Sequence, residues 1–395
     1  MIKERLDTII QSAIRLCVSF LPRNKKLIVY GGSHDLFIDN AKHQFIINNE
    51  IMQDYQHVWL TDSVDNLDYM HCHGFACQKS RSLKGILAIL RAGFVVYDDS
   101  INFFSFLNLS VGAQRINIWH GVPAKFIGPA RTEEDFLYYE EKHWWQRYSS
   151  PHDGGDYAIS THTAFSPVFS YCFHIPKERI IIGSYPRTRT FFMNEEERVG
   201  YINKYESKSF KDLYNSIKEE NQRKIIYMPT FRDKDKEYLS KAIPDWGRLN
   251  EICARLQIVL FVKVHRVTPL PNVSGFSNIR VMDNSMDVYP LLPLFDCLIT
   301  DYSSIMFDFA LTGKRVLLYT YDISDYCKYS RPLFRHFKEL LKELTVIKNF
   351  EDLLSSLKMN DDEIMDFPTK PYYELPFNER IIPDLIMKIN KNGKC

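Results

Sequence analysis

The chain has 395 residues, of which 45% are hydrophobic, and this length allows two domains that each bury a core. Its 50 lysine and arginine residues are balanced by 49 aspartate and glutamate residues. The net charge of +1 therefore gives no reason to expect a nucleic-acid partner, and any anion site must be local. No apolar run reaches the roughly 18 residues that a membrane span needs.

Residues 1–24 predict an amphipathic helix with a basic face. Its apolar residues recur near the helical period, and a helix of this kind associates with anionic membranes. A helix that packs on the first domain is the alternative, because two acidic residues dilute the basic face. The apolar positions are Leu6, Ile10, Ile14, Cys17 and Leu21.

Eight cysteines stand at irregular spacings without a signal peptide, which favours a reduced, cytosolic setting over a disulfide framework. The segment HCHGFAC contains residue types that bind soft metals. Because no second cluster completes a zinc spacing, we expect a loop at a strand edge and no metal site. The residues concerned are His71, Cys72, His73 and Cys77.

Short apolar runs bounded by turn residues alternate with helix-length segments, which indicates repeated βαβ units. In residues 25–200 the runs are KLIVYGG, HVWLTD, FVVYDDS, RINIWHG, DYAIS and RIIIGSYP. After a highly charged stretch the pattern restarts in residues 201–378 with KIIYMPTF, QIVLFVKVH, IRVMD, CLITD and VLLYTYD. Residues 379–395 predict a final helix that crosses back to the first domain.

Runs such as IVLFV are apolar on both faces, as parallel strands covered by helices require. We therefore predict an α/β fold with two Rossmann-like domains facing a central cleft, into which the loops beyond the carboxyl ends of the strands project. The sequence contains neither G-x-G-x-x-G nor G-x-x-x-x-G-K-[ST], so dinucleotide redox chemistry and P-loop chemistry lose support.

Most of the informative polar residues follow a predicted strand. In NIWHGVPAKFIG, His120 stands at a strand tip, and histidine is a residue type suited to proton abstraction. Gly121 removes the side chain that would block a substrate, and Lys125 follows in the next turn. A histidine that caps the next helix or is satisfied in the core is the structural alternative.

Two further strand ends carry cationic residues. Arg232, in IIYMPTFRD, has a planar fork that matches phosphate oxygens, unless it only pairs with a nearby aspartate. In VLFVKVHR, strand alternation would place Lys263 and His265 on the same face. A lysine within an apolar run is costly without an anion, so this pair is a candidate phosphate contact, unless the strand frays into solvent there.

The stretch LITDYSSIMFDF predicts a strand that stops at Asp301 and a helix that starts near Ser303 and Ser304. The free N–H groups and the dipole of a helix N-terminus favour a phosphate, although serines are also ordinary N-caps. Asp308 falls about one turn later, where it would orient a donor group or cap a neighbour.

Five motifs in order, the four quoted ones and GSYPRTRTFF, resemble the CDP-glycerol glycerophosphotransferase family of teichoic-acid primases and polymerases. The similarity extends from about Leu27 to beyond Tyr329. It implies the two-domain glycosyltransferase fold of the B type. It also implies transfer of glycerol phosphate or ribitol phosphate from a CDP-activated donor to a hydroxyl of a lipid-linked saccharide or a growing polymer, with release of CMP.

The resemblance implies His120 as general base, His265 as a second catalytic or phosphate-contacting histidine, and Arg232, Ser303 and Ser304 around the donor pyrophosphate. Lys263, Asp301 and Asp308 join the predicted donor site. Gly121, Lys125, Arg187 and Arg331 are possible acceptor or phosphate contacts. The chain departs from many relatives in having Arg266 after His265 and Pro332 after Arg331.

The predicted partners are CDP-glycerol or a related CDP-polyol, a polyprenyl-diphosphate-linked saccharide and the cytoplasmic face of the cell membrane. No cofactor is obligate, because protein cations can neutralise the leaving phosphate, and the role of magnesium stays open. The alternatives are a nucleotide-sugar glycosyltransferase or epimerase of the same fold and a catalytically silent membrane scaffold. Glycerol or ribitol, primase or polymerase, and wall polymer or capsule stay undecided.

Overall fold

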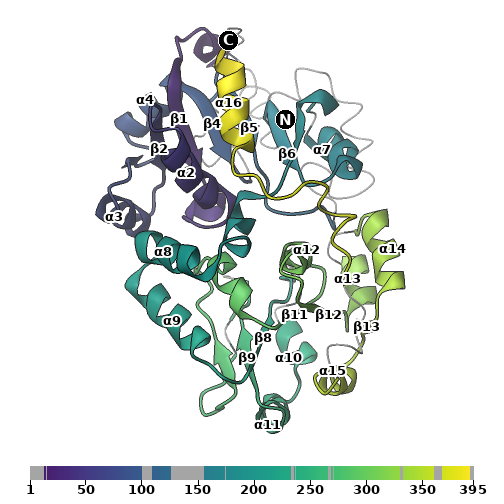
Figure 1. Cartoon of the computed structure of the whole chain (residues 1–395). Helices are drawn as coiled ribbons and strands as arrows, with labels where there is room; N and C mark the ends of the chain where they lie inside the picture. The colour runs from purple at the N-terminus through teal and green to yellow at the C-terminus, as the bar shows by residue number, and fades with distance from the viewer. Residues whose placement is uncertain are drawn as a thin grey trace, which may run out of the picture. The chain divides into compact units, whose positions relative to one another are not determined.

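The computed structural model describes residues 13–14, 16–99, 109–125, 155–173, 175–232, 235, 237–265, 268–269, 271–329, 332–359 and 367–391. The chain divides into two compact units (Figure 1). Unit 1 comprises Met1–His120, Gly128–Arg189 and Tyr373–Cys395, and unit 2 comprises Gly121–Ile127 and Thr190–Tyr372. The chain thus changes unit at residues 120 and 121, 127 and 128, 189 and 190, and 372 and 373, whereas the sequence predicted boundaries at 200 and 378.

Unit 1 contains a seven-stranded parallel sheet in the order β3-β2-β1-β4-β5-β6-β7. Six strands coincide with the predicted apolar runs; β3 has only two residues and therefore gave no periodic signal. The strands are β1 (Asn24–Gly31), β2 (Gln56–Leu60), β3 (Cys77–Gln78), β4 (Ala92–Tyr97), β5 (Gln114–Asn117), β6 (Tyr157–Ser160) and β7 (Ile180–Ile182).

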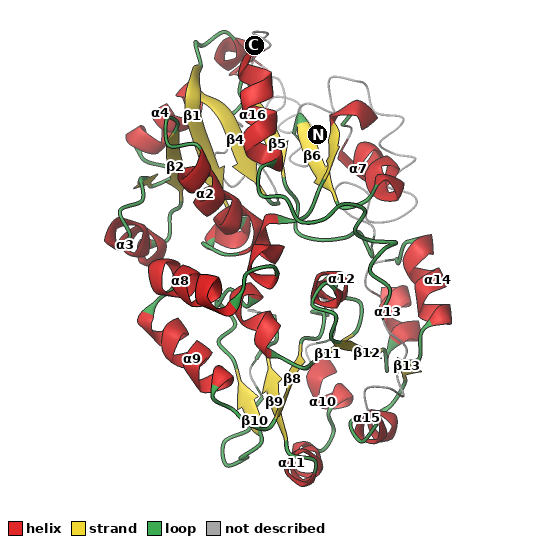
Figure 2. Cartoon of the chain, viewed as in Figure 1, coloured by secondary structure: helices red, strands yellow, loops and turns green. Residues whose placement is uncertain are grey.

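In the described residues, helices stand between β1 and β2, β2 and β3, β3 and β4, and β6 and β7, as the crossovers of a parallel sheet require (Figure 2). The α-helices of unit 1 are α2 (Asp39–Ile51), α3 (Val64–Cys72), α4 (Leu83–Arg91), α7 (Ser166–Phe173) and α16 (Ile381–Lys391). Short 3₁₀ turns are η1 (Ser33–Asp35), η3 (Thr163–Phe165), η4 (Lys177–Arg179) and η5 (Pro186–Phe191). Helix α16 belongs to unit 1, where Asn390 donates hydrogen bonds to the Lys25 carbonyl and the Tyr55 hydroxyl.

Unit 2 repeats the architecture with six parallel strands in the order β10-β9-β8-β11-β12-β13. They are β8 (Arg223–Tyr227), β9 (Ile258–Val262), β10 (Ile279–Val281), β11 (Cys297–Thr300), β12 (Arg315–Tyr319) and β13 (Val346–Ile347). The helices are α8 (Glu195–Tyr205), α9 (Lys208–Lys218), α10 (Tyr238–Ala242), α11 (Trp246–Arg255), α12 (Ile305–Ala310), α13 (Ile323–Tyr329), α14 (Arg335–Glu343) and α15 (Phe350–Ser356), with η6 (Tyr289–Leu294) before β11.

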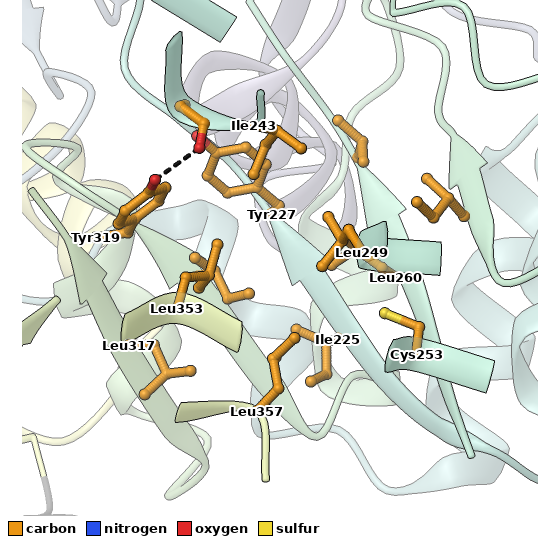
Figure 3. Packing of buried hydrophobic residues seen from close by; sticks show 14 of the residues in the cluster. Ile225, Tyr227, Ile243, Leu249, Cys253, Leu260, Leu317, Tyr319, Leu353 and Leu357 are labelled. Carbon is orange, nitrogen blue, oxygen red and sulfur yellow. Dashed lines mark hydrogen bonds between the residues drawn. The ribbon is translucent and has the colours of Figure 1, made fainter. Parts of the chain in front are cut away.

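The core of unit 2 lies where helices pack on the face of this sheet (Figure 3). Ile225 and Leu260 from the strands meet Leu249 and Leu353 from the helices, and all four are almost fully buried. The hydroxyl of Tyr319 donates to the Ala242 carbonyl, so the aromatic ring enters the core with its polar end satisfied. The predicted two-sided burial of the strands is confirmed by β9, whose five residues are all buried.

The segment HCHGFAC ends helix α3 and leads into β3. His73 follows the last helical residue and stacks on Tyr69 at 4.1 Å between ring centroids, while Cys72 is exposed and Cys77 is buried. Within the described residues no group of three or more histidine, cysteine, aspartate or glutamate side chains could hold a metal ion.

A buried chain of hydrogen bonds connects α2 to β1 and β2. The Asn48 side chain donates to the Tyr30 hydroxyl at 2.7 Å, and this hydroxyl lies 2.9 Å from Nδ1 of His57. Nε2 of His57 lies 3.0 Å from the Met52 carbonyl, which can only accept, so Nε2 carries the proton and Nδ1 accepts from Tyr30. These hydrogen bonds therefore need a neutral imidazole, and burial lowers the pKa of His57, which favours that form.

This network predicts that acid destabilises the protein. As the pH falls below about 6.5, the unfolded state binds a proton that folded His57 resists, so the free energy of unfolding decreases and is fully retained only above that pH. Unfolding by urea measured between pH 5 and pH 8 should show this slope. The variant His57→Gln should be less stable at pH 8 but show a shallower slope, and an equal slope in both proteins would contradict the assignment.

Candidate functional site

His120 lies just beyond β5, three residues after the strand ends, and is half-buried. Its Nδ1 lies 2.9 Å from the carbonyl oxygen of Asp98, the residue after β4, and its ring stacks on Trp119 at 3.9 Å. Because a carbonyl oxygen only accepts, Nδ1 carries the proton. In the neutral ring this leaves the lone pair on Nε2, which is the form that a general base needs.

Asp98 was not among the predicted site residues, although FVVYDDS had marked its strand. Its side chain is fully buried and accepts hydrogen bonds from the backbone N–H groups of Ser33 and Ala41, each at 3.0 Å. Burial and the nearby charge of Asp39 raise the pKa of Asp98 well above the usual range of a carboxyl group. The residue thus joins the ends of β1 and β4 to the start of α2.

Arg187, a predicted acceptor or phosphate contact, is engaged inside unit 1. It is 3% exposed, and its Nη1 lies 2.8 and 2.9 Å from the two carboxylate oxygens of Asp39. Its backbone N–H donates to the Asn40 side chain at 3.1 Å. The side chain therefore fixes the first turn of α2 in this structure.

Of the other predicted acceptor contacts, Gly121 and Lys125 belong to unit 2, and Arg331 lies outside the described residues. Gly121 has φ +145°, in the region that favours glycine, so a side chain here would strain the turn after His120. Lys125 forms an isolated antiparallel bridge with Leu333 and is half-buried. Arg331 and Arg266 lie outside the described residues.

Arg232 is held between two aspartates and is 3% exposed. It donates from Nε and Nη2 to Asp322 at 2.8 and 3.0 Å and from Nη2 to Asp301 at 2.8 Å. Nη1 donates to the Thr230 carbonyl, so four of the five N–H donors are used. From the sequence, pairing with a nearby aspartate, Asp233 or Asp235, was the alternative, and Asp233 lies outside the described residues. The partner Asp322, three residues beyond strand β12, was missed because it is 90 positions from Arg232.

Three tyrosine rings enclose this guanidinium group, with centroids 5.5, 5.1 and 4.7 Å from its central carbon. Burial lowers the pKa of Arg232, but the charges of Asp301 and Asp322 outweigh it and the net shift is upward. The group is therefore permanently charged. The rings belong to Tyr238, Tyr302 and Tyr326.

Asp301 follows β11 and is 2% exposed. Its Oδ1 accepts from the backbone N–H groups of Thr230 and Tyr302, and its Oδ2 accepts from Arg232. The structure thus brings Asp301 and Arg232 together, as the sequence predicted. Both carboxylate oxygens of Asp301 accept hydrogen bonds from groups of the protein.

The prediction that Lys263 and His265 share one face of a strand is wrong. Strand β9 ends at Val262, so the alternation of side chains does not extend to either residue. Lys263 is 9% exposed and its Nζ reaches the carbonyl oxygens of Asp283 and Asn284 at 3.5 and 3.2 Å, whereas His265 is exposed. Burial lowers the pKa of Lys263, as expected for an ammonium group inside the protein.

The strand and helix predicted in LITDYSSIMFDF are confirmed as β11 and the six-residue α12. Ser304 is the N-cap residue but its side chain makes no cap hydrogen bond, and Ser303 accepts only a long one, 3.5 Å, from the Ile305 N–H. Both serines are half-buried. Asp308 is fully buried and accepts a 2.6 Å hydrogen bond from the Tyr289 hydroxyl, so it anchors η6 to α12.

Two doubly wound parallel sheets, each with charged residues beyond its strand ends, are the architecture of the glycosyltransferase B fold. A solved structure of the wall teichoic acid polymerase TagF shares this fold, with a TM-score of 0.71 and 22% identity over 99% of this chain and 95% of that one. The UDP complex of MnaA from Staphylococcus aureus is more distant, with a TM-score of 0.55 and 10% identity over 93% and 97% of the two chains.

The sequence profile of CDP-glycerol:poly(glycerophosphate) glycerophosphotransferase matches residues 13–371, and the chain belongs to this family. It is 24% identical over 391 residues to the teichoic acid glycerol-phosphate transferase of Staphylococcus aureus, covering 93% of this chain and 92% of the relative. It is 23% identical over 380 residues to the teichoic acid poly(glycerol phosphate) polymerase of Bacillus spizizenii, covering 92% and 91%. The predicted family and phosphotransferase activity with a CDP-activated polyol are confirmed.

The geometry of Arg232 predicts that its loss destabilises unit 2. Arg232→Met would leave the buried Asp301 and the half-buried Asp322 without their counter-charge, and removing one partner of a buried pair typically costs about 3–5 kcal/mol. The urea midpoint should fall clearly relative to the wild type. Arg248→Met, which breaks an exposed pair with Glu351, should leave the midpoint almost unchanged. An unchanged midpoint in Arg232→Met with a raised KM for the donor would instead favour direct phosphate contact.

Proposed function

We propose that the chain transfers glycerol phosphate from CDP-glycerol to a hydroxyl group of a polyprenyl-diphosphate-linked saccharide or of a growing teichoic-acid chain. The observation that carries the mechanism is the hydrogen bond from Nδ1 of His120 to the Asp98 carbonyl, because it leaves Nε2 as the basic atom. The match to a glycerol-phosphate transferase along 93% of the chain favours glycerol. The ribitol-phosphate polymerase TarK of Staphylococcus aureus is 24% identical over 75% of the chain, so its match is shorter than that of the glycerol-phosphate transferase.

In the proposed step, Nε2 of His120 removes the proton of the acceptor hydroxyl, and the oxygen attacks the phosphorus that carries glycerol. A phosphorus–oxygen bond forms to the acceptor while the bond to the CMP phosphate breaks. CMP leaves with the electron pair, and the proton stays on the imidazole until solvent removes it. The reaction needs stabilisation of the leaving phosphate, which cationic and N–H groups provide.

Unit 1 is proposed to bind the acceptor and unit 2 the CDP donor. Lys263, Ser303 and Ser304 supply N–H and O–H groups at the strand ends of unit 2, and the exposed imidazole of His265 is proposed to contact a phosphate. We assign Arg232 and Asp301 to hold this end of the sheet, because their hydrogen bonds are directed to the protein. Asp308 is assigned the same kind of supporting role through Tyr289.

The proposal predicts that the protein releases CMP from CDP-glycerol when a synthetic lipid-linked acceptor is present. Mass spectrometry of the acceptor should show the added glycerol phosphate. His120→Ala should lower kcat by about a hundredfold or more and leave donor binding nearly unchanged, because a general base acts in the transition state. CDP-ribitol and UDP-sugars serve as parallel donors. Preferential turnover of a UDP-sugar would overturn the proposed donor class, and full activity of His120→Ala would overturn the base.

We further propose that unit 1 docks on the inner face of the cell membrane through the N-terminal segment and α4. Residues 1–12 and 15 of the predicted helix lie outside the described residues. In the described part, Val18 is buried in the core of unit 1, whereas Leu16 is 62% and Phe20 is 80% exposed. No helix in the described ranges is long and apolar enough to cross a membrane.

Helix α4 contributes exposed residues to the same proposed membrane-docking surface. Its residues Ile86 and Ile89 pack in the cluster that contains Val18, while Leu83 is 73% and Leu87 is 46% exposed. Lys84 and Arg91 are exposed on the same helix and would contact anionic lipid head groups. The arrangement accommodates both interpretations of the N-terminal helix, because one side packs on the protein and the other exposes apolar residues.

This surface predicts that replacing its exposed apolar residues weakens membrane binding. The double variant Leu16→Ser, Phe20→Ser keeps Val18 and should sediment with phosphatidylglycerol vesicles at least several-fold less than the wild type, because apolar insertion is lost. Phe192→Ser removes a half-exposed aromatic residue from unit 2 and serves as the matched control. Equal sedimentation of the double variant and the control would refute the docking surface.

A further inference from the structure

Trp119 has a backbone conformation that its side chain disfavours. Its φ is +49°, in the left-handed region, and the ring is 6% exposed. A bulky residue in this region is strained and persists only where the surroundings enforce it. The strained residue directly precedes His120 and stacks on its ring, so the direction of the imidazole depends on what holds Trp119.

Two buried asparagine side chains hold the backbone of Trp119. Its N–H donates to Oδ1 of Asn117 at 2.9 Å, and its carbonyl accepts from Nδ2 of Asn40 at 2.7 Å. Asn117 and Asn40 are 1% and 0% exposed. Asn117 is local to the turn, whereas Asn40 comes from the first turn of α2, 79 positions earlier in the chain.

Asn40 is itself fixed on both sides. Its Oδ1 accepts from the backbone N–H of Arg187 at 3.1 Å, so both ends of the amide are used. The next residue, Ala41, donates its N–H to the Asp98 side chain, and the Asp98 carbonyl accepts from Nδ1 of His120. The first turn of α2 thus reaches His120 by two routes: through the Trp119 backbone and through Asp98.

We infer that Asn40 is a positioning residue for the reaction: it holds Trp119 in the left-handed conformation that directs Nδ1–H of His120 to the Asp98 carbonyl. The inference rests on the proposed role of His120. Without the Asn40 amide, Trp119 relaxes toward negative φ, the His120 ring turns, and Nε2 no longer keeps a fixed direction. Misplacement of a catalytic group by about 1 Å can lower a rate by about a hundredfold.

The test compares Asn40→Ala and Asn40→Asp with Asn48→Ala. Asn40→Asp retains the acceptor for the Arg187 N–H but loses the donor to Trp119. Asn48 lies on the same helix, is equally buried and bonds to Tyr30, so it reports the cost of losing any buried amide of α2. Both Asn40 variants should lower kcat by about ten- to a hundredfold with KM for CDP-glycerol within about twofold, whereas Asn48→Ala should change kcat less than about twofold.

The second readout is the ring tautomer of His120, read from imidazole ¹⁵N shifts at pH 8 and assigned by the signal that His120→Ala removes. The wild type and Asn48→Ala should show the Nδ1–H form, and the Asn40 variants should gain the Nε2–H form. An unchanged tautomer, or a kcat loss no larger than that of Asn48→Ala, overturns the inference. If His120→Ala retains turnover, the proposed base is wrong, but the tautomer comparison still decides the role of Asn40.

Discussion

The arrangement of polar groups in each unit depends on the hydrogen bonds that one aspartate accepts at the switch point of the sheet. In unit 1 Asp98 follows the fourth strand and accepts the Ser33 N–H beyond the first strand, and in unit 2 Asp301 accepts the Thr230 N–H in the same way. At this point the strand order reverses, and the backbone N–H groups beyond the two central strands need hydrogen-bond acceptors. Each aspartate therefore joins the segments that follow two neighbouring strands.

The aspartate has the same position in both units, but the charges around it differ. In unit 1 the aspartate is buried next to Asp39, which raises its pKa, and its backbone carbonyl orients His120. In unit 2 the aspartate is paired with the buried Arg232, which donates two further hydrogen bonds to the half-buried Asp322. Buried charges of this kind must be paired and hydrogen-bonded to be tolerated. In the proposed function, the first arrangement orients the base, and the second stabilises the strand ends that are proposed to bind the donor.

The sequence predicted the strands well because each is a continuous apolar run, such as IVLFV, whose burial needs no knowledge of its neighbours. It missed the two-residue strand β3 and extended β9 through Lys263 to His265, since polar residues within a run do not reveal where pairing stops. His120, Arg232 and Asp301 were predicted as site residues from their places after strands, and the structure pairs Arg232 with Asp301. Asn40 and Asp322 gave no such signal, because their partners are 79 and 90 positions away.

The sequence alone determined the α/β class, the division into two domains and the membership of a CDP-polyol phosphotransferase family, because periodicity and motif order are properties of neighbouring residues. Only the tertiary structure decided which polar side chains serve the fold: Arg232 and Asp301 neutralise each other, Arg187 fixes α2, and His120 is held through Nδ1. The physical reason is that the protonation and direction of a polar group depend on its spatial neighbours, and those come from distant positions in the chain.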